Sequence, residues 1–192
     1  MASTQSAIRY DLDRDVRTVE QMAARLTPYI YENELYGLMP GDLPKLTVGG
    51  LLMRLHRLST ISDQLSSKQQ ESVSAAAKRL DDVRREWPVA LENKVQREFQ
   101  ARLKAVDQFV NECTESPQSC IDNYPPAAEQ RTILQALNDE AAAHNYLTDQ
   151  MRSALQVLDN KLRRYLQPGD FIWDARLKPA YPSDIYWFLY VR

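Results

Sequence analysis

The sequence predicts an all-α fold, an elongated antiparallel helical bundle with an aromatic-rich C-terminal tail docked on it. Apolar residues recur every three or four positions over most of the chain, which is the spacing of a buried helix face. Glycine accounts for only 5 of the 192 residues, which argues against a turn-rich β-sandwich. Two stretches without glycine, 69–113 and 126–166, are each long enough for a helix of about 60 Å. We therefore expect two long helices and an elongated molecule.

The composition indicates a single ordinary domain. Charged residues make up 26% and apolar residues 44%, both typical of a soluble globular protein. The net charge of −2 gives no general attraction to nucleic acid or anionic lipid. No apolar run approaches the ~20 residues of a membrane-spanning helix, and the N-terminus lacks the apolar core of a signal peptide. We expect a cytoplasmic protein with no membrane or nucleic-acid partner, built as a bundle over 1–166 with the tail of 167–192 packed on it in the same domain.

The first helix is expected over about 10–38. Thr27 and Pro28 interrupt it, either as a kink or as a break in which Thr27 caps a new helix start. The apolar stripe stays in phase across Pro28, which favours a single kinked helix. Two prolines and a glycine in 39–44 then end it. The stripe consists of Leu12, Val16, Val19, Ala23, Leu26 and Ile30.

Two further helices follow. Thr47 is the predicted N-cap of a helix over about 47–66. A third helix is expected over 69–113, where apolar residues average about 3.6 positions per step, the period of a nearly straight helix. Pro88 is expected to bend it, because proline removes one backbone donor and crowds the preceding turn. The buried side of the 47–66 helix is predicted to be Leu51, Leu55, Leu58, Ile61 and Leu65.

The fourth helix is expected over 126–166 and ends before Pro168 and Gly169. The residues of its stripe, which includes His144 and Thr148 among apolar residues, alternate strictly between steps of three and four, which is a heptad seam. This pattern predicts that the helix wraps a partner helix as in a coiled coil. The tail beyond it holds seven of the seventeen aromatic residues. We expect that tail to dock on the bundle, with a short helix beginning at Pro182.

The two cysteines, Cys113 and Cys120, bracket a proline-containing turn. No nearby cysteine or histidine completes a zinc site, which needs four ligands. A cytoplasmic protein keeps its thiols reduced, so we expect both cysteines to be free. The short spacing leaves open the alternative that they close a small disulfide loop.

The first candidate binding site is formed by Glu140, His144 and Thr148, which share one face of the predicted fourth helix. Dinuclear metal bundles use a Glu-x-x-His motif on two helices, with a further glutamate from each of two others. Here the spacing is Glu-x-x-x-His and it occurs once, so we expect no metal site. The favoured interpretation is that His144 is a polar seam residue that fixes helix register. The alternative is that the three side chains hold a polar ligand.

The second candidate site is a tyrosine-rich helix end that contains Tyr29, Glu32 and Tyr36. Tyrosines beside carboxylates can form an amphipathic pocket that stacks on a ring and accepts its hydrogen bonds. Aromatic residues at helical spacing more often fill a bundle core. We therefore favour packing over ligand binding at this end.

The third candidate site comprises Lys45, Thr47, Gly49 and Gly50 at a predicted helix start. Free backbone N–H groups, a hydroxyl and a lysine can bind an anion there. The segment lacks the residue order of a phosphate-binding Walker loop. Close helix packing by the glycines is the favoured interpretation.

No arrangement of serine, histidine and aspartate suggests a catalytic triad, so we expect no catalytic residue and no cofactor. The leading hypothesis is a non-enzymatic protein-interaction or scaffold bundle that binds a protein partner or a second copy of itself as a homodimer. The alternative is a helical-bundle protein or enzyme that binds a small molecule or metal through the tyrosine-rich end or His144.

Overall fold

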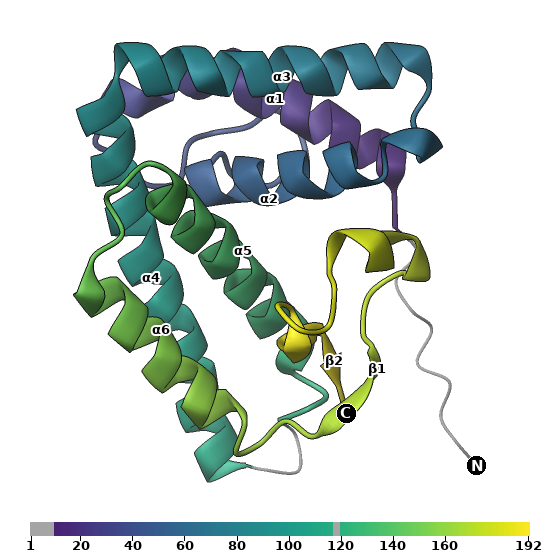
Figure 1. The fold of residues 1–192 in the computed structure, drawn as a ribbon, viewed down its shortest axis with the longest axis vertical. Helices are drawn as coiled ribbons and strands as arrows, with labels where there is room; N and C mark the ends of the chain where they lie inside the picture. Colours follow the sequence, from purple (N-terminus) through teal and green to yellow (C-terminus); the bar gives the residue numbers. More distant parts are fainter. Residues whose placement is uncertain (1–9, 117–119) are drawn as a thin grey trace.

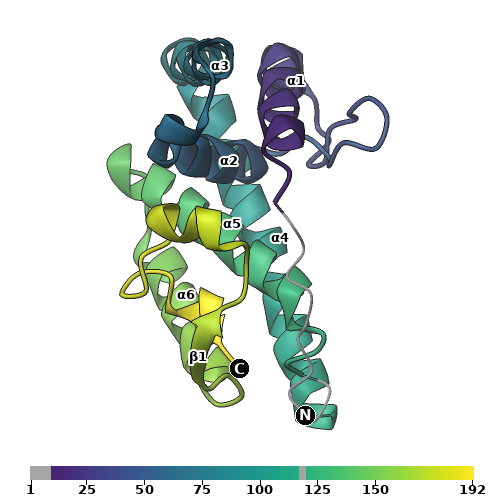
Figure 2. The same cartoon turned by 90° about the vertical axis from the view of Figure 1, so that its right-hand side faces the viewer.

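The computed structural model describes residues 10–116 and 120–192 (Figures 1 and 2). The predicted all-α class is confirmed, because helices dominate these ranges and the two strands are short. None of the described helices is long and apolar enough to cross a membrane. The α-helices are α1 (Leu12–Tyr31), α2 (Val48–Thr60), α3 (Ser67–Glu86), α4 (Pro88–Glu115), α5 (Tyr124–Ala143) and α6 (Asp149–Leu162). The shorter elements are η1 (Ser62–Gln64), β1 (Pro168–Phe171), η3 (Ala175–Ala180), η4 (Trp187–Leu189) and β2 (Tyr190–Val191).

Helix α2 lies at the centre of the arrangement and contacts α1, α3, α4 and α5. Helices α1 and α3 lie side by side at the top of Figure 1, with α2 beneath them. Helix α4 leaves the end of α3 at a steep angle and descends, and α5 and α6 both pack against it (Figures 1 and 2). The result is a bent assembly of helices of 13 to 28 residues.

Helix α1 continues through Pro28 as predicted, but it ends at Tyr31 instead of residue 38. After it, the segment 32–47 forms a loop that projects from the helices (Figure 2). The backbone groups of Gly37 and Leu46 pair across the neck of this loop, with N···O distances of 2.9 and 3.0 Å. The two prolines and the glycine of 39–44 thus lie inside a closed loop, beyond the end of α1.

The prediction for the second helix is confirmed in its start and its buried side. Thr47 caps α2 by accepting a hydrogen bond from the Gly50 N–H, and all five predicted core residues are buried. The helix ends at Thr60, earlier than predicted. Ser66 then caps α3 in a capping box with Gln69, in which each side chain bonds the other residue's backbone N–H.

The predicted single helix over 69–113 is wrong, because the chain turns sharply at Trp87 and Pro88. Trp87 has φ −134° and ψ 47°, outside the helical region that a following proline disfavours. The Trp87 N–H donates to the Val83 carbonyl and ends α3, while the Trp87 carbonyl accepts from Leu91 N–H and begins α4. Proline is well suited to this first helical position. Pro88 therefore starts a new helix and does not merely bend an old one.

The predicted helix over 126–166, with its heptad seam and coiled-coil packing, is also wrong. Helix α5 stops at Ala143, and Asn145 adopts a left-handed conformation with φ 63°. Asparagine is one of the few residues that tolerate this helix-ending geometry. The hydroxyl of Thr148 then accepts from the Met151 N–H and caps α6. These two local signals divide the segment into two helices, and α6 packs on α4.

The C-terminal segment contacts helices α2 and α5 and the chain just before α1. The Tyr124 hydroxyl of α5 donates to the Phe188 carbonyl at 2.7 Å, and His56 Nε2 of α2 donates to the Ala180 carbonyl at 2.7 Å. The N–H of Tyr10, just before α1, donates to Asp174 at 2.9 Å. Strands β1 and β2 pair antiparallel within the segment. The helix predicted to begin at Pro182 is a turn.

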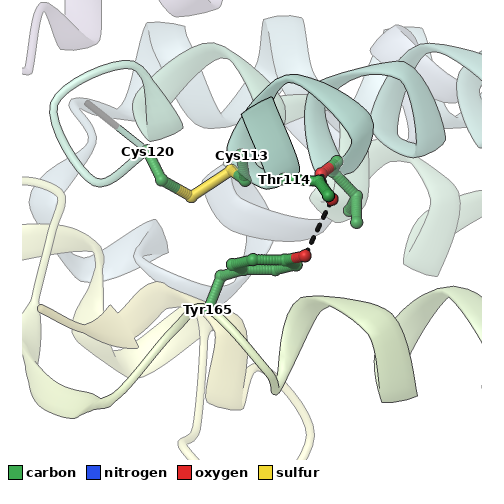
Figure 3. Close-up of a disulfide and its surroundings, with 5 residues drawn as sticks. Cys113, Thr114, Cys120 and Tyr165 are labelled. Atoms are coloured by element: carbon green, nitrogen blue, oxygen red, sulfur yellow. Dashed lines mark hydrogen bonds between the residues drawn. A yellow bond between two sulfur atoms is a disulfide. The ribbon is translucent and has the colours of Figure 1, made fainter. Parts of the chain in front are cut away.

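Cys113 and Cys120 form a disulfide, so the expectation of free thiols is wrong (Figure 3). Helices α4 and α5 pack against each other (Figure 1), and the disulfide joins the last turn of α4 to the chain just before α5. The two Cα atoms lie 4.9 Å apart, within the range that a disulfide can bridge. Beside it, the hydroxyls of Thr114 and Tyr165 lie 2.7 Å apart and connect α4 to the chain after α6 (Figure 3).

We predict that replacing both cysteines with serine lowers the free energy of unfolding by about 2–3 kcal/mol. A cross-link over a loop of this length removes about that much conformational entropy, expressed as free energy, from the unfolded chain. Urea unfolding of the wild type and of the Cys113→Ser/Cys120→Ser variant measures the difference. Dithiothreitol is expected to destabilise the wild type equally and to leave the variant unchanged. Equal stability of oxidised wild type and variant would contradict the prediction.

Candidate functional site

A buried carboxylate from α4 occupies the start of α2. Glu98 is 0% exposed, and its Oε2 accepts a hydrogen bond from the Gly49 N–H at 2.8 Å. A helix N-terminus favours a negative charge, so Glu98 stands where a bound anion would. The predicted anion site is therefore filled by the chain itself. Of its other members, Thr47 caps α2, Gly50 donates to that cap, and Lys45 is exposed.

Arg102, one turn after Glu98, completes this cluster. Its Nη2 donates to Glu98 Oε1 at 3.0 Å and lies 3.3 Å from the Thr47 hydroxyl, to which it also donates. Its Nη1 donates to Gln130 of α5 at 2.5 Å. The ion pair thus connects α4 to both α2 and α5. The guanidinium carbon also lies 5.5 Å from the ring centre of Tyr36, within cation–π range.

The tyrosine-rich helix end meets the same cluster. Tyr29 is buried, its hydroxyl donates to the Leu35 carbonyl at 2.7 Å, and the Lys94 ammonium lies 4.0 Å from its ring centre. Burial raises the pKa of Tyr29 well above its usual value, so the hydroxyl stays a donor. Tyr36 is half exposed over Arg102, while Glu32 is exposed at the end of α1. Two sites predicted separately therefore meet around Glu98 and Arg102 in a packed, hydrogen-bonded cluster.

The predicted site of Glu140, His144 and Thr148 has a different geometry from the one expected. Glu140 is buried and accepts two hydrogen bonds from Arg84 of α3, at 2.8 and 2.5 Å. His144 is not a seam residue: it follows α5, its side chain is 43% exposed, and its Nε2 lies 3.5 Å from Glu140 Oε1. Thr148 is engaged in capping α6. Glu140 and His144 therefore lie close together, as predicted. Arg84 is a further partner of Glu140, and no sequence pattern indicated it.

A cavity of about 290 Å³ lies between α2 and α5, beside this ion pair. Both histidines line it, because His56 of α2 faces the same space as His144. The His56 ring packs near Tyr181 and Tyr186, with ring centres 5.9 and 6.1 Å away. Burial raises the pKa of Tyr181 to about 12, so its hydroxyl stays protonated at neutral pH. His56 and His144 are far apart in the sequence, so no sequence pattern indicated that they line the same cavity.

A larger cavity of about 550 Å³ lies on the other side of α2, between α2, η1 and α3. Leu52, His56 and Arg84 line both cavities, so the two are adjacent. Across residues 10–116 and 120–192, no three His, Cys, Asp or Glu side chains are grouped to hold a metal ion. The larger cavity offers a concave, mostly apolar surface, open to solvent on one side, with hydrogen-bonding groups among its lining residues.

No protein-family model matches this chain, and neither a curated protein nor a solved structure matches it.

We predict that Glu98→Gln lowers the free energy of unfolding by about 3–5 kcal/mol. The change removes the charge that neutralises Arg102 and leaves a buried cation unpaired. Glu112→Gln is the matched control, because Glu112 lies on the same helix, is exposed, and its side chain accepts a hydrogen bond from the nearby Gln108. That variant is expected to stay within about 0.5 kcal/mol of the wild type in urea unfolding. Equal effects of the two substitutions would rule out the proposed role of Glu98.

Proposed function

We propose that this protein is a non-enzymatic interaction module that forms a homodimer through an apolar patch where α3 turns into α4. The patch consists of Tyr31, Trp87 and Val89. The observation that carries the proposal is the contact between Tyr31 and Trp87, whose rings meet edge to face with centres 4.4 Å apart. The three side chains are 54%, 37% and 69% exposed, respectively.

Single exposed apolar side chains are common on protein surfaces, whereas large contiguous apolar patches mark interaction sites. Tryptophan and tyrosine are also the residues that most often dominate the binding energy of interfaces. Here Tyr31 ends α1, whereas Trp87 and Val89 belong to the junction of α3 and α4. Because separate helices hold its parts, the patch is preformed, and little conformational entropy is lost when it binds.

The charges beside the patch support a second copy of the chain as the partner. Glu32 follows Tyr31, while Arg85 and Glu86 precede Trp87, and all three are exposed. Arg85 already pairs with Asp82 of its own helix. We propose that, in a two-fold dimer built on the patch, Arg85 of one copy also faces Glu32 and Glu86 of the other. The small net charge of −2 adds little repulsion between copies.

The cytoplasmic location expected from the sequence remains part of this proposal. The Cys113–Cys120 disulfide weighs against it, because the cytosol keeps most thiols reduced.

We predict that Tyr31→Ser/Val89→Ser weakens dimerisation at least ~30-fold, corresponding to about 2 kcal/mol of lost contact energy. Sedimentation equilibrium measures the change against the mass of the 22.2 kDa chain. Both residues are more than half exposed, so the folded monomer should tolerate the substitutions. Trp87 is left in place because it forms the helix junction.

Val157→Ser is the matched control, since Val157 is 54% exposed on α6. It is expected to leave dimerisation unchanged. A wild type that stays monomeric at about 100 µM, a concentration at which most chains are paired in a dimer with a micromolar Kd, would overturn the proposal. Equal weakening by the control would show that a different face is used.

A further inference from the structure

We propose that the larger cavity, between α2, η1 and α3, binds an uncharged amphipathic small molecule. Its volume of about 550 Å³ lies in the range of small-molecule pockets, about 300–1,000 Å³. This inference is independent of the dimer patch.

The floor of the cavity is apolar. Leu52, Leu55 and Leu58 contribute from α2, and Val73 and Leu80 face them from α3. These side chains belong to the hydrophobic core of the protein or pack against it, so the floor is continuous with that core. An apolar ligand body placed there removes hydrocarbon surface from water on both sides. The floor therefore selects a ligand with a substantial hydrocarbon or aromatic part.

The edge of the cavity carries hydrogen-bonding groups whose donors are mostly in use. The Ser59 hydroxyl donates to the Leu55 carbonyl at 2.7 Å, and the Gln70 amide nitrogen donates to the Ser62 carbonyl at 2.8 Å. His56 donates through Nε2, so Nδ1 is its remaining ring nitrogen. The atoms left at these groups include the hydroxyl, amide and imidazole acceptors. They suit a ligand that carries a hydroxyl or an N–H group.

The charges at the cavity neutralise one another. Asp81 and Arg84 are the charged side chains of its lining, and they are bonded to each other at 2.5 Å. Arg84 is held as well by Glu140, the partner described above. A charged ligand would lose hydration here without gaining a free counter-charge. The lining therefore favours an uncharged ligand over phosphates, nucleotides and carboxylates.

Two related dyes test this selection on the intact protein. N-phenyl-1-naphthylamine is uncharged, has one N–H donor and becomes fluorescent when it leaves water. The dye 1-anilinonaphthalene-8-sulfonate has the same rings and adds a sulfonate. We expect the uncharged dye to bind one saturable site with a Kd on the order of 10 µM, and the sulfonate to bind at least ~10-fold more weakly. Absence of saturable binding of the uncharged dye, or equal binding of both dyes, would overturn the proposal.

A pair of substitutions on α3 locates the site. Ala77 lines the cavity and is half-buried, so Ala77→Phe fills part of its volume. Ala75 lies two residues away on the same helix and is exposed, so Ala75→Phe adds the same ring to the surface. We expect a loss of at least ~10-fold in affinity for N-phenyl-1-naphthylamine in the first variant and none in the second.

If Ala77→Phe lowers the thermal stability, Ser74→Phe at the exposed edge of the same cavity serves as the second filling variant. Unchanged affinity in both filling variants would overturn the assignment of the dye to this cavity. Ala77→Phe and Ser74→Phe do not touch the dimer patch, so both variants are expected to sediment like the wild type. A loss of dye binding without a change in sedimentation therefore concerns the cavity proposal alone.

Discussion

The carboxylate of Glu98 at the start of α2 is the interaction on which the arrangement of the helices depends. Helix α2 contacts four other helices, and its first turn is positioned by a residue 49 places further along the chain. An ionised side chain in the interior is tolerated only when its charge is compensated. Here the helix dipole, a backbone N–H and Arg102 compensate it together. Gly49 is required for this geometry, because a Cβ there would lie 2.6 Å from Ile133 Cγ2 of α5.

Other ion pairs, each with one buried partner and one partly exposed partner, repeat this principle between different helices. Asp15 of α1 accepts from Arg57 of α2 at 2.6 Å, and Arg131 of α5 donates to Asp159 of α6 at 2.7 and 2.9 Å. Separating such a pair inside the protein costs about 3–5 kcal/mol. Apolar faces on helices of this length can pack in several ways with similar burial. The ion pairs disfavour the alternatives, since each alternative leaves a charge unpaired.

Apolar spacing predicted that most of the chain is helical, and it identified the cap at Thr47 and the buried side of α2. The apolar spacing did not predict the ends of the helices. Its steps of three and four residues continue across Trp87 and across the α5–α6 loop, although the chain changes direction at both places. Asn145 and Thr148 were local signals of a helix end and a helix start, and the regular spacing outweighed them. The candidate sites were incomplete for another reason. Glu98 and Arg84 act through partners about fifty residues away, and no short-range pattern reports such pairings.

The loop between α1 and α2 projects from the helices and is closed at its base. Its neck is fixed by the Gly37–Leu46 backbone pair. Gly41 near its tip is exposed, and apart from its two chain neighbours no atom lies within 4 Å of where a Cβ would be. Lengthening a loop whose ends are already held costs little additional entropy. The tip is therefore the natural position for a peptide tag or a fluorescent label, since material added there stays outside the helices and leaves both termini free.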